Sequence, residues 1–182
     1  MSSLKLTLRA WPVIAAATIG LCYLTQTVAK WFGIELPDQA NIDVVRRYAG
    51  WNRTFLFLCV QILVLLPAIE ELVFRWLLWR LPARTFGRRR KAFGAEGLEA
   101  EGLRRRQLGL TAGGGAIVSS TLFSAAHYIA QPVPDSAFLA LFFFGLAQCW
   151  LYRKTDRLWC AILNHGLFNL TNLILLFLLP ST

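Results

Sequence analysis

The chain has no paired cysteines. Its four cysteines, Cys22, Cys59, Cys149 and Cys160, each lie alone in an apolar stretch, with no CxxC motif among them. Small zinc modules and thioredoxin-like redox motifs depend on such closely spaced pairs. The sequence therefore excludes both classes, and we expect the cysteines to be small apolar side chains inside the fold.

Acidic residues are also scarce. Ten Asp and Glu stand against nineteen Lys and Arg, which gives a formal net charge of +9. A basic chain can bind nucleic acid, but a docking surface would combine basic and aromatic residues, and no such pattern occurs here. The basic residues lie mostly between apolar segments, as the positive-inside rule describes for membrane proteins. We therefore expect a lipid bilayer as a partner and no nucleic acid.

Long polar stretches are few, and hydrophobic residues make up 56% of the chain. A membrane helix needs about 20 apolar residues. Without an internal repeat, the sequence predicts one all-α, polytopic membrane helix bundle with about five transmembrane helices. The candidate spans are residues 10–29, 54–81, 111–131, 136–152 and 158–179.

The charged connections predict an orientation for this bundle. We divide the chain into a first membrane helix with its outer loop (1–53) and a helical core (54–182). Within the core, a basic loop at about 84–106 and the cluster around Arg153–Arg157 fall on the same side as Lys5 and Arg9. The positive-inside rule then predicts a cytoplasmic N-terminus, and a bacterial inner membrane is the expected location.

The first apolar run has two interpretations. Residues 10–29 follow Lys5 and Arg9 and resemble a secretory signal peptide in that respect. The run is long enough to span a bilayer, so we expect it to be retained as a membrane helix.

The third span opens with a series of small residues. Gly109, Gly113, Gly115 and Ser120 recur along it. Small side chains let membrane helices approach closely, so this face is predicted to pack against a neighbouring helix.

The second span carries two adjacent carboxylates, Glu70 and Glu71. Ionisable residues inside a membrane segment are costly and usually functional. Arg75 follows Glu71 by one helical turn, so these two can form a supporting ion pair. Glu70 points about 100° away and has no cation on its own turn, which suits it to act as a general base. Pro67 should kink the helix and leave the carbonyl of Leu63 without a partner.

The chain contains only two histidines, and both lie in apolar spans. His127 follows Ser120 and Ser124 on nearly the same helical face, and His165 lies one turn before Asn169. Each could serve only in helix packing. Since three separate spans each contribute a polar motif, a shared site is the better interpretation.

These motifs resemble a known family. Glu70-Glu71-x-x-x-Arg75, Phe123-x-x-x-His127 and His165-x-x-x-Asn169 occur in the order found in the CPBP family, which includes type II CAAX prenyl endopeptidases and Abi-related, glutamic-type intramembrane proteases. The resemblance covers about 54–172 and implies a membrane-embedded peptidase. Its substrate would be a peptide or protein, lipidated or anchored in the membrane. Trp76, where the family commonly has Gly, and the long basic insertion leave the substrate subgroup open.

The resemblance and the residues together predict a mechanism. Glu70 would activate a water molecule that His127 helps to hold, and the water would attack a peptide bond near a membrane-associated or C-terminal segment. His165 and Asn169 would donate hydrogen bonds to the oxyanion of the intermediate.

A metal site is the competing arrangement. Glu70, His127 and His165 also form the ligand set of many catalytic zinc centres. The chain has no HExxH pair, and Glu70 would have to serve as both ligand and base. We therefore favour a mechanism without a cofactor, with zinc or another divalent metal as the alternative.

Two other functions fit the same fold. One is a catalytically silent membrane regulator or immunity protein, and the other is a small transporter that uses Glu70 and the histidines as a proton relay. The absence of an internal repeat disfavours the transporter.

Overall fold

The computed structural model describes residues 2–34, 45–50, 52–81, 98–130 and 135–178. Over these ranges every regular element is a helix, which confirms the predicted all-α bundle. The elements in chain order are α1 (Ser3–Trp31), α3 (Arg53–Val60), η1 (Gln61–Leu65), α4 (Leu66–Glu70), η2 (Glu71–Arg80), α6 (Leu98–Ala130), α7 (Asp135–Thr155) and α8 (Leu158–Leu178).

Three helical stretches in the described part are long and apolar enough to cross a membrane. They are Ser3–Trp31, Arg53–Arg80 and Leu158–Leu178. Helices α6 and α7 correspond to the other two predicted spans, 111–131 and 136–152. Three candidate membrane spans together with the further helices are consistent with the predicted all-α membrane helix bundle.

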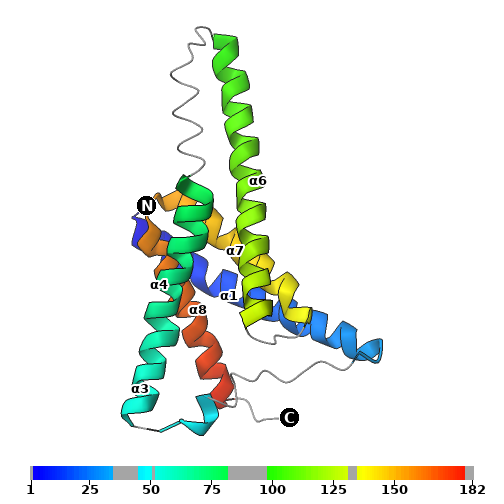
Figure 1. Cartoon of the computed structure of the whole chain (residues 1–182), viewed down its shortest axis with the longest axis vertical. Coiled ribbons are helices and arrows are strands. Elements are labelled where there is room, and N and C mark those ends of the chain that lie inside the picture. The colour runs from blue at the N-terminus through cyan, green and yellow to red at the C-terminus, as the bar shows by residue number, and fades with distance from the viewer. Residues whose placement is uncertain (1, 35–44, 51, 82–97, 131–134, 179–182) are drawn as a thin grey trace.

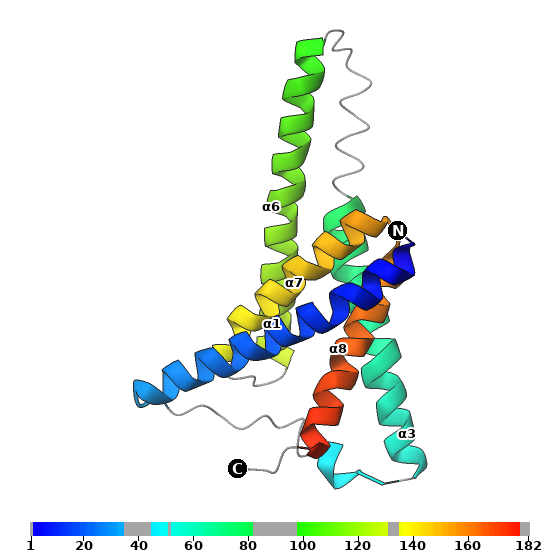
Figure 2. The ribbon, with the colours of Figure 1, turned by 180° about the vertical axis from the view of Figure 1, so that it is seen from behind.

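The segment from α3 to η2 forms one long rod that runs beside α8 (Figure 1). Helices α1 and α7 lie side by side and cross this rod at a steep angle, as the view from behind also shows (Figure 2). Helix α6 packs on both α7 and η2. The site residues of the rod, α6 and α8 are thereby brought to one region of the bundle.

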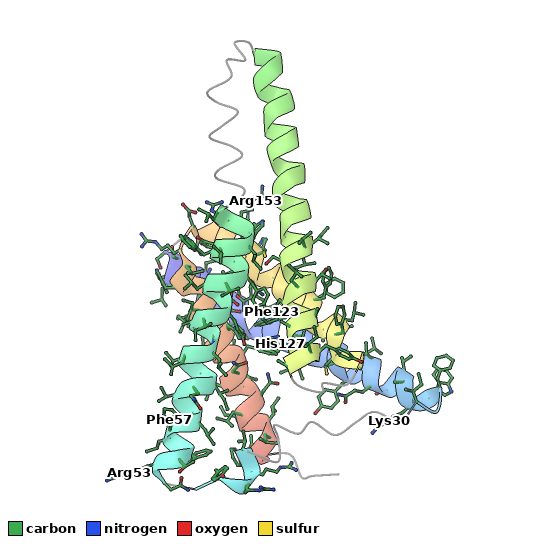
Figure 3. All side chains as sticks on the ribbon, viewed as in Figure 1. Lys30, Arg53, Phe57, Phe123, His127 and Arg153 are labelled. Atoms are coloured by element: carbon green, nitrogen blue, oxygen red, sulfur yellow. The ribbon has the colours of Figure 1, made fainter. Side chains whose placement is uncertain are left out.

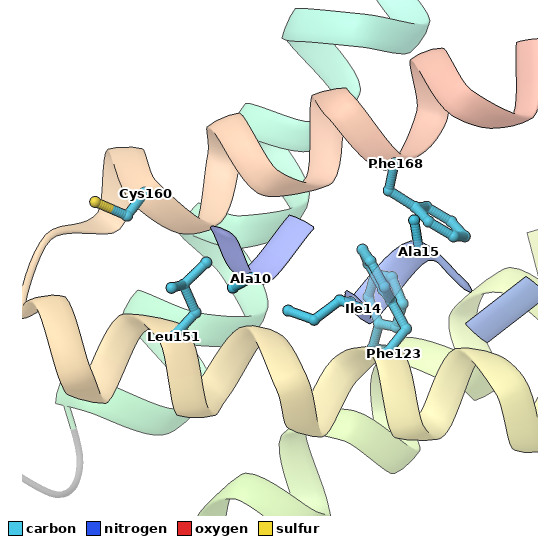
Figure 4. Packing of buried hydrophobic residues seen from close by; sticks show 8 residues of the cluster. Ala10, Ile14, Ala15, Phe123, Leu151, Cys160 and Phe168 are labelled. Carbon is cyan, nitrogen blue, oxygen red and sulfur yellow. The ribbon is translucent and has the colours of Figure 1, made fainter. Parts of the chain in front are cut away.

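The interior is built from four helices. Its largest apolar cluster joins α1, α6, α7 and α8 (Figure 4). In a bilayer, helices associate through close packing because lipid is as apolar as the side chains. The cluster consists of Ala10, Ile14, Ala15, Phe123, Phe144, Leu151, Cys160 and Phe168.

Helix α1 is part of this bundle. It buries Ala10, Ile14 and Ala15 in the cluster, and the indole of Trp11 donates a hydrogen bond to Thr171 Oγ1 on α8 at 3.2 Å. These contacts join α1 to α8 and to the core cluster.

The small residues of the third span do form a packing face. A Cβ added at Gly145 of α7 would lie 2.9 Å from Ser120 Cβ, and one at Gly115 would lie 3.0 Å from Trp79 Cδ1. Gly113 and Gly114 have nothing within 4 Å of such a Cβ. The predicted close approach is thus confirmed at Gly115 and Ser120.

The predicted basic loop at 84–106 is partly wrong. Residues 98–106 are the first turns of α6. They are rich in Leu, Glu, Ala and Arg, which favour helix, and this local preference outweighed the charge pattern that suggested a loop. Residues 84–97 of that prediction lie outside the described residues.

Candidate active site

The two glutamates meet at a change in helix type. Glu70 is the last residue of α4 and Glu71 is the first residue of the π-helical segment η2. π-helical turns are rare and frequently mark functional sites. Both carboxylates reach the same imidazole: Glu71 Oε1 lies 2.9 Å from His165 Nδ1, and Glu70 Oε2 lies 3.5 Å from His165 Nε2.

Glu71 and Arg75 form the ion pair that their spacing predicted. Arg75 Nε lies 3.2 Å from Glu71 Oε2, and both side chains are fully buried. The sequence did not indicate that Glu71 also binds His165, a residue 94 positions away. Glu71 therefore joins the cation of its own helix to a histidine of α8.

Glu70 lies on the accessible side of this arrangement. Its side chain is 23% exposed and that of His127 is 22% exposed, whereas His165 is only 4% exposed. Glu70 Oε1 lies 3.9 Å from His127 Nε2, which is too long for a direct hydrogen bond and suits a bridging water. Glu70 thus lies between the Nε2 atoms of the two histidines, as the sequence motifs suggested.

The tautomer of each histidine follows from its partner. His127 Nδ1 lies 3.0 Å from the carbonyl oxygen of Phe123, which can only accept, so Nδ1 carries the proton. In the neutral ring, Nε2 is then an acceptor directed at Glu70. His165 Nδ1 donates to the Glu71 carboxylate in the same way. Figure 3 shows Phe123 and His127 where α6 faces the α4–η2 part of the rod.

Asn169 contacts the rod through a backbone carbonyl. Its Nδ2 donates to Ile62 O at 2.8 Å. In η1 the N–H of Leu66 donates to Gln61 O, five residues back, which is the π-helical pattern. In the same pattern the partner of Ile62 O would be the N–H of residue 67. That residue is Pro67, which has no N–H. The prediction named Leu63 as the carbonyl left open by Pro67. Because the turn is π-helical, the carbonyl that lacks a helical partner is that of Ile62, and Asn169 of α8 donates to it.

Helix α8 approaches η1 closely at a second point. A Cβ on Gly166 would overlap the carbonyl oxygen of Leu63. Only glycine lets the two backbones come this near, and Gly166 follows His165 directly. The contacts of α8 with the Ile62 and Leu63 carbonyls therefore determine where α8 lies along the rod. They also determine the positions of His165 and Asn169 relative to Glu70.

Several polar residues near the motifs do not join the site. Asn172 bonds Phe168 O on its own helix at 3.2 Å, and Ser120 and Ser124 are fully buried. Gln148 Nε2 donates to Asn164 Oδ1 at 3.1 Å, and both side chains are fully buried. The sequence gives no sign of this pair, because Gln148 lies alone in an apolar run.

Three of the site residues are also potential metal ligands. Glu70, His127 and His165 direct one carboxylate and two Nε2 atoms at one another, a donor set that zinc accepts. Among the residues that the structure describes, however, no three His, Cys, Asp or Glu side chains are grouped closely enough to hold a metal ion. The mechanism proposed below therefore uses the side chains alone, with zinc or another divalent metal as the alternative.

Comparisons with known proteins agree with the motifs. No curated protein and no solved structure matches the chain. The model of one family, Rce1-like, described as type II CAAX prenyl endopeptidase, matches residues 52–171, a range that contains both glutamates, Arg75, both histidines and Asn169. This range covers well over half of the sequence. The chain therefore belongs to the Rce1-like family of type II CAAX prenyl endopeptidases, a family of membrane proteases.

Proposed function

We propose that this chain is an intramembrane endopeptidase that hydrolyses a peptide bond near a membrane-associated or C-terminal segment, with Glu70 as the base that activates water. The observation that carries the proposal is the position of Glu70. Its carboxylate is partly exposed and lies 3.5 and 3.9 Å from the Nε2 atoms of His165 and His127. No other described carboxylate combines access with two histidines.

The first step is proton transfer from water. Both the Glu70 carboxylate and the Nε2 atom of neutral His127 accept hydrogen bonds, so a water between them donates one hydrogen to each. The water oxygen then directs a lone pair at the substrate carbonyl carbon. Glu70 takes the proton as the C–O bond forms.

The second step stabilises the oxyanion. Because His165 Nδ1–H is committed to Glu71, His165 can donate from Nε2 only when both ring nitrogens carry protons, and the adjacent Glu71 carboxylate compensates that charge. Asn169 uses one amide hydrogen on Ile62 O and has a second available for the oxyanion. One such donor contributes about 100- to 1,000-fold to rate.

Collapse of the intermediate completes the cycle. The C–N bond breaks, and protonated Glu70 returns its proton to the leaving amine. The products are a new carboxylate and a new amine, so one water is consumed for each bond broken. Glu71 and Arg75 hold His165 during this sequence through the buried ion pair.

The surroundings of the site support a substrate that is lipidated or anchored in the bilayer. Large apolar side chains on the rod next to Glu70 are exposed, including Leu66, Ile69 and Leu72. The junction between α7 and α8 lies near the N-terminus of the chain (Figure 1). Exposed Arg153, Lys154 and Arg157 lie at or beside this junction, the arrangement expected for a cytoplasmic end. We propose the bacterial inner membrane as the location.

The test is cleavage by the full chain reconstituted in liposomes, with a panel of C-terminal peptides, prenylated and free, and single-helix substrates. Wild type should cleave at least one class, and Glu70→Gln should lose activity by about 1,000-fold or more. Asp156→Asn is the matched control, since it removes a carboxylate that pairs with Arg80 outside the site. Full activity in Glu70→Gln would refute Glu70 as the base.

The Glu70→Gln variant, expressed in a living host, distinguishes a regulator from a peptidase. A regulator acts through helix contacts, so Glu70→Gln would leave its biological effect intact, whereas a peptidase would lose it. Proton flux into liposomes that depends on Glu70, without cleavage of any peptide, would identify a transporter.

A further inference from the structure

Phe123 lies at the centre of the site without taking part in the proposed chemistry. Its side chain is fully buried in the core cluster. Its ring centroid lies 4.4 Å from that of His127 and 5.9 Å from that of His165. Phe123 is thus in contact with both histidines.

The same ring also contacts the buried cation. The guanidinium carbon of Arg75 lies 4.3 Å from the Phe123 centroid. Arg75 is fully buried, and its Nη1 and Nη2 find no hydrogen-bond acceptor among the described residues. Its charge is therefore balanced by the Glu71 carboxylate and by the negative face of the Phe123 ring.

The backbone of Phe123 has a separate role. Its carbonyl oxygen accepts from His127 Nδ1 and so determines which nitrogen of His127 faces Glu70. One residue therefore contacts the site in two ways, by its carbonyl on His127 and by its ring on Arg75.

We propose that Phe123 is a positioning residue of the active site, whose ring holds Arg75 and through it the Glu71–His165 pair. The inference rests on the proposed peptidase function for its effect on rate. Its physical core is the contact sequence from the Phe123 ring to Arg75 (4.3 Å), from Arg75 to Glu71 (3.2 Å) and from Glu71 to His165 (2.9 Å). Weakening the contact between the Phe123 ring and Arg75 therefore also loosens the contact between Glu71 and His165.

Phe144 provides a matched control. It is also fully buried and lies 5.0 Å from the His165 ring, closer than Phe123 does. No described cation lies over its ring; its nearest aromatic neighbour is Phe168 at 4.5 Å. The two phenylalanines therefore share burial and contact with His165, and they differ in the contacts that Phe123 makes with Arg75 and His127.

The experiment replaces Phe123 by phenylalanines of increasing fluorine content, up to pentafluorophenylalanine, in the full-length protein. Fluorine withdraws electron density from the ring face with little change in shape, so it weakens attraction to a cation selectively. The same series is made at Phe144 and at Phe123 in an Arg75→Met background. Since the chain has only two histidines, ¹⁵N-histidine labelling reports both site rings directly.

We expect the His165 ring resonances to shift progressively with fluorine content at Phe123, and kcat to fall by about 10-fold at the pentafluoro end with KM unchanged. The Phe144 series and the Arg75→Met background should show no such trend. The inference is overturned by a flat Phe123 series, by an equal trend at Phe144, or by a His165 shift without loss of kcat.

Failure of the proposed function would look different. If wild-type protein cleaves no peptide, the peptidase proposal fails, while the ¹⁵N shifts and the unfolding midpoint of each variant still decide whether the ring of Phe123 holds Arg75. A progressive fall of that midpoint with fluorine content at Phe123 alone supports the contact, and its absence refutes it.

Discussion

Glu71 Oε1 lies 2.9 Å from Nδ1 of His165, and this bond joins the rod to α8 inside the bundle. Because Glu71 also pairs with Arg75, the carboxylate is shared between a structural cation and a histidine that faces Glu70. The apparent division of the two glutamates into a catalytic and a purely structural residue is therefore incomplete. Glu71 also contacts a histidine of the candidate site.

Replacing Glu71 by Gln tests this bond. Losing the carboxylate leaves Arg75 without its counterion, at a cost of about 3–5 kcal/mol, and allows His165 to turn, which should lower kcat by ~100-fold or more. The measurements are peptide cleavage and thermal unfolding in liposomes or detergent. The double variant Glu71→Gln/Arg75→Met should recover stability but not kcat, since the unpaired charge is gone and His165 is still unheld. Wild-type kcat in Glu71→Gln would contradict the orienting role.

Asn169→Leu should lower both stability and kcat, each for a different reason. It leaves Ile62 O unsatisfied, which costs about 1–3 kcal/mol, and removes one oxyanion donor, worth about 100- to 1,000-fold in kcat. Adding Pro67→Ala restores a backbone N–H in register with Ile62 O, so stability should return without activity. Asn172→Leu is the control, because Asn172 bonds only its own helix among the contacts described. Recovery of activity in the double variant would show that Asn169 serves only to cap Ile62.

Gly166→Ala should be strongly destabilising. The added methyl overlaps the backbone oxygen of Leu63, which cannot rotate away, so α8 and η1 must separate and move His165 from Glu70. The matched change Gly113→Ala places a methyl in open space on helix α6 and should stabilise by about 0.5–1 kcal/mol. Unfolding midpoints of the two variants are compared with wild type. Equal effects at both sites would rule out the close approach as the cause.

Metal removal separates the two mechanisms. We expect dialysis against a chelator to leave kcat unchanged, since in the proposed mechanism Glu70 activates the water without a metal ion. Metal content by mass spectrometry is measured on the same samples before and after dialysis. Activity that disappears with the metal and returns when zinc is added would establish the alternative with Glu70, His127 and His165 as ligands.

Much of the site could be predicted from residue types alone. Ionisable residues in apolar spans are few, so Glu70, Glu71, His127 and His165 stand out without any structure. The Glu71–Arg75 pair follows from helical periodicity, which is local. Partners across helices do not, because they depend on how the rod crosses α8 and α6. For this reason Glu71–His165, Ile62–Asn169 and Phe123–Arg75 could not be predicted.

The sequence by itself determined that the chain forms apolar helices, that its costly polar residues lie on three of them, and which family it resembles. The first two properties follow from composition and spacing within single segments, and the resemblance rests on three motifs in a fixed order. The tertiary structure decided which nitrogen of each histidine faces Glu70, and which carbonyl Asn169 satisfies. It also placed two adjacent glutamates on opposite sides of one imidazole. The physical reason is that a π turn and a close helix crossing change side-chain partners by one residue, a shift that no local pattern records.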